Sequence, residues 1–128
     1  MIEMKKLFSI ILLALFYFNP VIADCYHANI EAYSTFKHAR QAYGANNLDT
    51  CQRNAEKAQE YASNARYAYY AELNTSNCSC GGAETEAYSA YIYAENAYRA
   101  DSLEICKRYA RKTYLSALKA KSKAHNCN

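Results

Sequence analysis

Small side chains recur through most of this chain at alternating spacings of three and four residues. In the first stretch they are Cys25, Ala28, Ala32, Thr35, Ala39 and Ala42, and the same spacing continues through 48–65, 80–97 and 103–127. Residues spaced in this way share one face of an α-helix and form a heptad seam. Because alanine replaces leucine, two helix axes can approach to about 8 Å, the lower end of the usual range. The pattern therefore predicts an all-α protein with unusually close helix packing.

The second half of the chain repeats the first, with matching residues always the same number of positions apart. The letters EAYS at 31–34 recur at 86–89, and Cys51 matches Cys106 in the same way. This constant distance along the sequence, from Cys51 to Cys106, is here called the repeat shift. The period is too long for the common 34-residue helical-pair repeats. We interpret the pattern as an internal duplication, in which repeat 1 covers 25–77 and repeat 2 covers 80–128.

Turn signals divide each repeat into two helices. Asn46 and Asp101 are the predicted N-caps, because an acidic residue follows each of them three positions later. The expected helices are 26–43, 48–73, 83–98 and 103–126. Short connections make neighbouring helices antiparallel. The predicted fold is all-α: two tandem duplicated antiparallel helical hairpins, four helices in all, with an alanine-rich coiled-coil-like seam and disulfide cross-links.

The antiparallel arrangement also predicts which charged side chains meet across a hairpin. In an antiparallel hairpin the residue numbers rise along one helix as they fall along the other. If Cys80 faces Cys127, every pair of residues that face each other therefore has the same sum of residue numbers as this pair. That register places Glu86 beside Lys121 and Glu84 beside Lys123, although a slip of one position stays open.

Residues 1–23 have the features of a secretory signal peptide. Lys5 and Lys6 precede an apolar run over 7–18, and residues 21–23 resemble a cleavage site before Asp24. The run is shorter than the ~20 residues needed to span a bilayer, so we expect no stable membrane insertion after cleavage. A lipid anchor on Cys25 is the alternative, which the large Asp24 disfavours. The predicted product is one domain, 24–128, exported to the periplasm or secreted.

All six cysteines follow the predicted cleavage point, as expected for disulfides formed outside the cytoplasm. Cys51 and Cys106 lie at the turn end of their hairpins, about 35 Å from the other four at 1.5 Å per residue. Disulfide geometry therefore allows them to pair only with each other. The predicted bonds are Cys25–Cys78, Cys51–Cys106 and Cys80–Cys127. The exchange to Cys25–Cys80 and Cys78–Cys127 stays open.

A metal site is the alternative use of the same end of the molecule. It would consist of Cys78, Cys80, His125 and Cys127, ligand types that suit zinc or copper(I). The spacing does not match a standard zinc motif, and exported thiols tend to oxidise. We therefore expect disulfides and no cofactor.

Thirteen of the 14 tyrosines lie beyond residue 23, more than a core of small residues needs. Tyrosine is enriched in protein interfaces and among their hot spots. The predicted partner-binding residues are Tyr33, Tyr43, Tyr67, Tyr70, Tyr88, Tyr91 and Tyr98. The alternative is that these rings cover the seam and bury themselves between the hairpins, with only their hydroxyls in water.

Charge and motifs argue against catalysis and against nucleic-acid binding. The formal net charge is +3, and the excess is concentrated in the helix expected at 103–126. That helix presents either a solvated face or a contact for an acidic surface. His27, His38 and His125 are scattered, and there is no phosphate-binding glycine loop. Export makes intracellular nucleic acid an unsuitable target.

These observations predict a small exported, non-enzymatic binding protein. Its tyrosine-rich helical face would meet a protein partner in the periplasm or outside the cell, in the manner of inhibitor, immunity or envelope accessory proteins. A metal-binding or thiol-redox protein and a purely structural envelope component are the alternatives. The sequence identifies neither the partner nor the oligomeric state.

Overall fold

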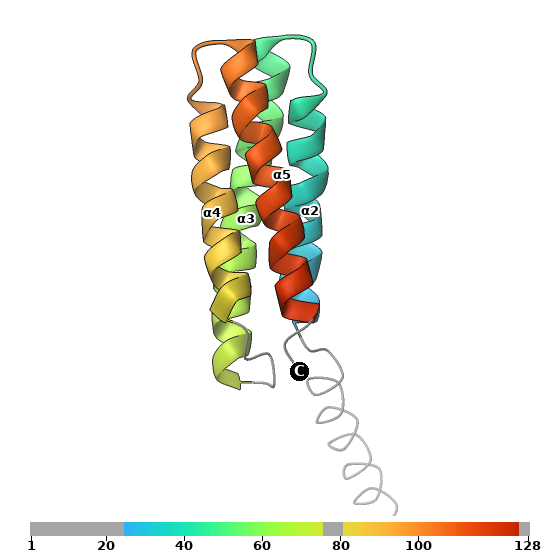
Figure 1. Ribbon diagram of the computed structural model, residues 1–128, viewed down its shortest axis with the longest axis vertical. Helices are drawn as coiled ribbons and strands as arrows, with labels where there is room; N and C mark the ends of the chain where they lie inside the picture. Colours follow the sequence, from blue (N-terminus) through green and yellow to red (C-terminus); the bar gives the residue numbers. More distant parts are fainter. Residues whose placement is uncertain (1–24, 76–80, 126–128) are drawn as a thin grey trace, which may run out of the picture.

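The computed structural model describes residues 25–75 and 81–125, excluding the side chains of 72–75 and 125. The helices in these ranges are α2 (Tyr26–Tyr43), α3 (Leu48–Thr75), α4 (Gly81–Tyr98) and α5 (Leu103–His125). They run alternately up and down, and α2 packs between α3 and α5, as does α4 (Figure 1). The described part of the chain contains no strand. The all-α, four-helix prediction is confirmed, and every helix begins and ends within two residues of its expected bounds.

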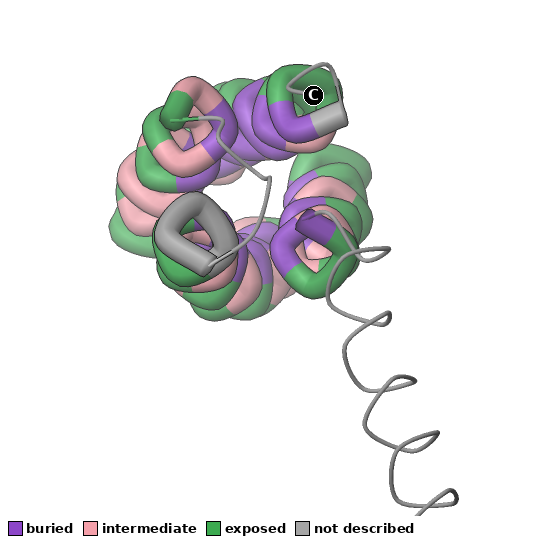
Figure 2. Tube along the Cα trace, turned by 90° about the horizontal axis from the view of Figure 1, so that it is seen from below, coloured by how far each residue is buried: buried purple, intermediate pink, exposed green. Residues whose placement is uncertain are grey.

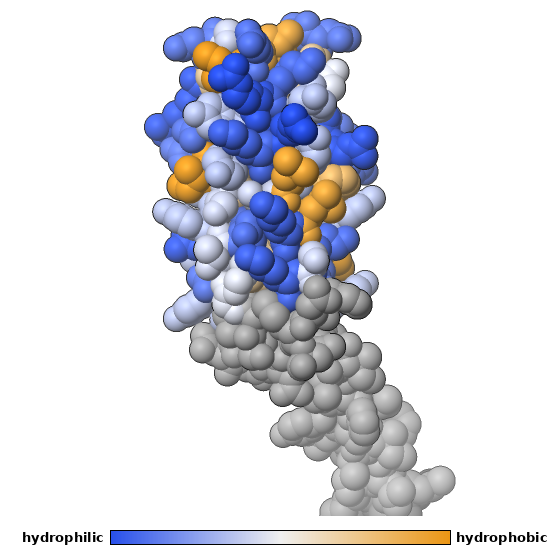
Figure 3. All heavy atoms as spheres, viewed as in Figure 1, coloured by the Kyte–Doolittle hydropathy of each residue, from blue (hydrophilic) through white to orange (hydrophobic). Residues whose placement is uncertain are grey.

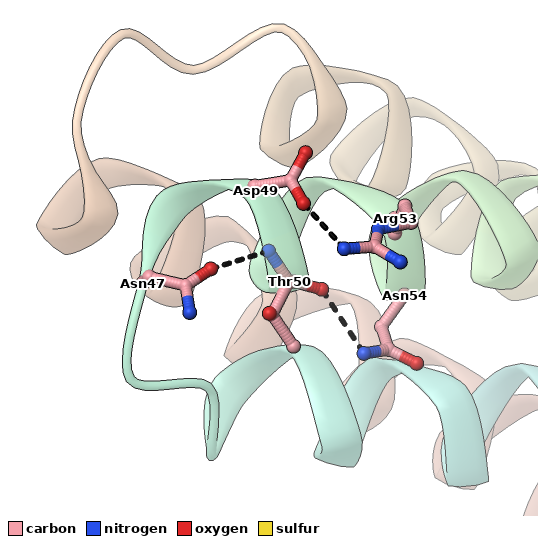
Figure 4. Close-up of polar contacts among 5 residues, drawn as sticks. All are labelled: Asn47, Asp49, Thr50, Arg53 and Asn54. Atoms are coloured by element: carbon pink, nitrogen blue, oxygen red, sulfur yellow. Dashed lines mark hydrogen bonds and ion pairs between the residues drawn. The ribbon is translucent and has the colours of Figure 1, made fainter.

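The helices α3 and α5 begin at side-chain caps one residue later than the sequence analysis places them. The backbone N–H of Thr50 donates to Oδ1 of Asn47 at 2.8 Å (Figure 4), and that of Ile105 donates to Oγ of Ser102 at 3.2 Å. The predicted caps Asn46 and Asp101 are therefore wrong. The residues just before them, Ala45 and Ala100, are buried at the bundle end. The connection between the helices reverses direction only after these alanines. The N-caps are therefore the residues immediately before each helix, Asn47 and Ser102.

The core consists of the predicted seam and of almost nothing larger. In α2 and α4, the buried residues are the seam residues alone. Figure 2 shows the buried positions of all four helices turned toward one central axis. Midway along it, two small residues from each helix leave no space for a water molecule; they are Ala32, Thr35, Ala62, Ala65, Ala87, Ala90, Ala117 and Ala120. The four seams therefore share one core.

The few polar groups in this core form hydrogen bonds. The hydroxyl of Thr35 donates to the carbonyl of Glu31 at 2.9 Å, and the hydroxyl of Thr113 donates to the carbonyl of Tyr109 at 2.8 Å. Tyr69 is the largest fully buried side chain. Its hydroxyl donates to Oδ1 of Asn29 at 2.7 Å. Each of these three hydroxyls thus has the partner that offsets its desolvation.

A disulfide joins Cys51 of α3 to Cys106 of α5, with a Cα–Cα distance of 6.4 Å. This bond confirms the predicted pair and cross-links two diagonally opposed helices at the turn end. Cys25 is buried at the opposite end, and no described cysteine is free. The predicted partners Cys78, Cys80 and Cys127 lie outside the described residues, so the other two bonds stay predictions.

The charged pair observed in the second hairpin differs from the predicted pairs. Nζ of Lys123 lies 2.9 Å from a carboxylate oxygen of Glu86, the residue expected beside Lys121. Lys121 instead lies over the ring of Tyr33 in α2, 5.0 Å from its centroid. The reason is that each helix has two neighbours in the closed bundle. Residues on the two sides of a seam therefore face different helices.

The disulfide generates a prediction about stability. Replacing Cys51 and Cys106 by alanine should lower the free energy of unfolding by about 4 kcal/mol, because it opens a loop of 55 residues in the unfolded chain. Alanine suits the seam, so the helix content at room temperature should be retained. Circular dichroism during thermal unfolding measures both quantities. An unchanged melting temperature would contradict the prediction.

Candidate binding surfaces

The tyrosines that the sequence analysis selects lie mainly at the surface. Six of them have between 41 and 64 % of their area exposed: Tyr33, Tyr43, Tyr67, Tyr70, Tyr88 and Tyr98. Tyr91 is half-buried. The middle of the seam is filled by small residues, and these side chains lie beside the helix contacts. Figure 3 shows hydrophobic groups interspersed with hydrophilic ones on the face where α5 lies in front.

The first aromatic cluster lies along the contact between α2 and α5, here called the α2/α5 surface. The ring of Tyr114 packs edge-on against Phe36 and Tyr43, with both centroid distances at 5.9 Å. Lys107 lies over the Tyr43 ring at 5.7 Å. Arg40, also on α2, lies over the ring of Phe36 at 5.6 Å. This surface therefore alternates aromatic rings with cations.

A second aromatic cluster lies along the contact between α3 and α4, here called the α3/α4 surface. Tyr88 and Tyr91 stack with a centroid distance of 6.4 Å. The guanidinium of Arg66 lies 4.2 Å from the ring centroid of Tyr88 and 5.7 Å from that of Tyr67. Because α3 and α4 are the other two helices of the ring, this surface is on the opposite side of the bundle (Figure 2).

The seven selected tyrosines are thus divided between two opposite sides. Tyr33 and Tyr43 belong to the α2/α5 surface, whereas Tyr67, Tyr88 and Tyr91 belong to the α3/α4 surface. Tyr70 is exposed on α3 and Tyr98 at the end of α4; they are not among these ring contacts. Sequence reasoning found the charge excess of 103–126, but it did not place the α5 cations beside these tyrosines, and it missed Tyr114.

Several contacts of the first half of the chain recur in the second half between residues that are one repeat shift further along the sequence. Lys121 over Tyr33 corresponds to Arg66 over Tyr88, and the ring pair Tyr33–Phe36 corresponds to Tyr88–Tyr91. The caps Asn47 and Ser102 correspond in the same way. The repeat shift relates Lys121 to Arg66, but it aligns Lys107 and Arg111 with Gln52 and Glu56, so it would not have located the rest of the α5 contribution.

Glu31 and Glu86 also correspond, but their surroundings differ. Glu86 pairs with Lys123, whereas the position of repeat 1 equivalent to Lys123 is Ala68. Oε2 of Glu31 is accordingly buried without a hydrogen-bond partner among the described residues. One carboxylate is therefore compensated and its counterpart is not.

His38 lies between α2 and α3, where it stacks on Tyr61 with a centroid distance of 5.2 Å. Burial lowers the pKa of His38 below its ordinary value of 6.5, and the positive charges of Lys57 and Lys37 lower it further. A hydrogen bond to the side chain of Gln41 opposes this shift. The shift favours the neutral imidazole in the folded protein.

The described residues contain no cluster of three or more His, Cys, Asp or Glu side chains suited to a metal ion. The residues of the alternative metal site, Cys78, Cys80, Cys127 and the His125 side chain, lie outside the described part. None of the helices within the described ranges is long and apolar enough to cross a bilayer.

Comparison of the chain with protein-family models, curated proteins and solved structures finds no match. No fold or activity is therefore carried over from a relative. The two surfaces themselves, with their exposed rings and their cations, are the features of this bundle that bear on function.

Replacing each of the two glutamates by glutamine gives a matched pair of variants whose free energies of unfolding can be compared. E86Q should lower the free energy of unfolding by about 0.5 kcal/mol, because it removes the ion pair with Lys123. E31Q should leave it unchanged or raise it, because the buried oxygen it replaces has no partner. Urea unfolding of both variants measures the difference. Equal losses in both variants would contradict the prediction.

His38 generates a prediction about pH. Its pKa is lower in the folded state than in the unfolded chain, so the unfolded chain binds the proton more readily. The stabilising contribution of neutral His38 is therefore present above pH 6.5 and is lost as the pH falls toward the lowered pKa. The melting temperature of H38Q should consequently fall less than that of the wild type on acidification. If the melting temperatures of H38Q and the wild type change in parallel with pH, His38 does not make this contribution to stability.

Proposed function

We propose that this protein is a small exported, non-enzymatic binding protein that presents its aromatic surfaces to a protein partner. The observation that carries the proposal is the exposure of six selected tyrosines on helices that pack through buried alanines. Tyrosine offers a large contact area with few rotatable bonds, so little entropy is lost when a partner orders it. The partner is met in the periplasm or outside the cell.

The cations beside the rings support this function further. Lys107 and Lys121 lie over Tyr43 and Tyr33, which keeps part of each ring covered and positions the charges at the rim. Interfaces commonly combine aromatic anchors with a polar rim of this kind. The α2/α5 surface has both components and is the better candidate for the first contact.

The proposal includes the architecture that displays these surfaces. Two hairpins, 25–77 and 80–128, descend from one duplicated unit, and residues 1–23 direct export. The caps and ring contacts that match at the repeat shift support the duplication. Cys25–Cys78 and Cys80–Cys127, or the exchanged pairs, close the end opposite Cys51–Cys106.

Site-specific photo-crosslinking in the exporting host tests the function. A benzophenone amino acid at Tyr33 or Tyr43 should give a discrete protein adduct, which mass spectrometry identifies. The control position is Asn96, which is exposed on α4 three residues after Tyr93; Tyr93 packs against Tyr109 of α5. The absence of a discrete adduct at all seven selected tyrosines, or an equal yield at Asn96, would overturn the proposal.

A further inference from the structure

The α2/α5 surface carries an excess of positive charge. Its four cations, each lying over or near an aromatic ring, are Arg40, Lys107, Arg111 and Lys121. Arg111 lines a pocket of about 620 Å³ together with Tyr43 and Lys107. The pocket includes one acidic residue, Glu104, which Arg108 neutralises through an ion pair at 3.4 Å. The pocket is therefore open to a negatively charged group.

The α3/α4 surface carries carboxylates, and one of them, Glu56, aligns at the repeat shift with Arg111 of the basic pocket. A pocket of about 280 Å³ is lined by Glu56, Gln59, Glu60, Ser63, Asn64 and Tyr91. Both glutamates are exposed, and neither forms an ion pair with a described cation. The cation of this surface, Arg66, lies over Tyr88. The aromatic ring and the free carboxylates suit a partner that brings cations and rings.

The two surfaces correspond in their rings and differ in their charges. At the repeat shift Tyr33, Phe36 and Tyr43 align with Tyr88, Tyr91 and Tyr98, so the aromatic positions are kept. At the same shift three of the four cations change to acidic or neutral residues: Arg40 aligns with Glu95, Lys107 with Gln52, and Arg111 with Glu56. The fourth, Lys121, aligns with another cation, Arg66. The chain therefore carries, on opposite sides, two surfaces of similar aromatic pattern, one basic and one with exposed carboxylates.

We propose that the α2/α5 surface of one molecule docks on the α3/α4 surface of a second copy of this chain. This inference rests on the proposed function, because it takes the aromatic surfaces to be protein-binding, and it names the partner. Arg111 and Lys107 of one copy would face Glu56 and Glu60 of the next. Because the two surfaces are different and lie on opposite sides, the contact is heterologous and leaves both surfaces free at the ends of a chain of copies.

The size of the surfaces sets the strength of this contact. A helix of 18 residues is about 27 Å long, and two adjacent helices are about 20 Å wide. Each copy would then bury roughly 500 Å², a total near the lower end for specific complexes. Association is therefore weak, steered by charge and sensitive to salt, because exposed charges are screened beyond about 8 Å at physiological ionic strength.

Sedimentation velocity on the exported, disulfide-bonded protein tests the proposal. The weight-average mass should rise with protein concentration up to the millimolar range at low salt, and it should fall when salt is added. A wild-type protein that remains monomeric throughout this range would overturn the proposal.

Charge-reversal variants test which surfaces meet. K107E/R111E makes both surfaces acidic and E56K/E60K makes both basic, so each variant alone should associate about tenfold or more weakly than the wild type. A mixture of the two should form a one-to-one complex, because each acidic surface then meets a basic one. The control K112E/K119E changes the net charge as much as K107E/R111E does, at exposed positions on the side of α5 where Lys112 lies over Tyr93 of α4. It should associate like the wild type.

Two outcomes of the mixing experiment would overturn the inference: unchanged association of either variant alone, or a mixture that stays monomeric. The crosslinking experiment distinguishes this failure from failure of the proposed function. An adduct of Tyr33 or Tyr43 with a different protein, together with a monomeric wild type, leaves the function standing and removes the second copy as partner. An adduct with a second copy of the chain supports both.

Discussion

Close packing of alanine along one central axis is the constraint on which the rest of the structure depends. The residues around the middle of the axis leave no space for water, so no larger side chain fits there. The same packing limits the apolar area that each residue buries, because alanine has a single methyl group. The hydrophobic effect contributes about 0.8 kcal/mol per buried methylene, so each alanine contributes little to the stability of the fold. A core of this kind favours covalent support. The Cys51–Cys106 bond supplies it between α3 and α5, at the end where the chain turns.

The narrow core also determines what the outside of the bundle looks like. Rings that would fill the interior of a leucine-packed bundle lie instead in the shallow contacts between neighbouring helices, where Tyr114 meets Phe36 and Tyr43. Long cationic side chains cover these rings, as Lys121 does at Tyr33. An exposed aromatic surface is thus a direct consequence of alanine at the axis. The binding function proposed for the protein uses a feature that its packing already imposes.

The two halves of the chain share their helix caps and the positions of the disulfide cysteines, but they differ in surface charge. The caps Asn47 and Ser102 serve equivalent helices in the same way, and the disulfide joins equivalent residues. Structural positions of this sort tolerate few replacements, because each satisfies a backbone group or fits the axis. The residues beside the seam face solvent, so Arg111 and Glu56 can differ at equivalent places. Two opposite surfaces of one bundle can consequently complement each other.

The sequence by itself determined the helices, the seam and the Cys51–Cys106 disulfide, because each depends on local periodicity or on the length of a helix. Helix phase places Ala28 and Ala32 on one face whatever lies opposite, and the distance between bundle ends leaves Cys51 only Cys106. Cap positions were wrong by one residue, because Ala45 is buried before the chain turns back. Only the tertiary structure decided which neighbour each flanking residue meets. Lys121 faces Tyr33 in α2 because closing four helices around one axis assigns the two sides of every seam to different helices, an assignment that no single hairpin contains.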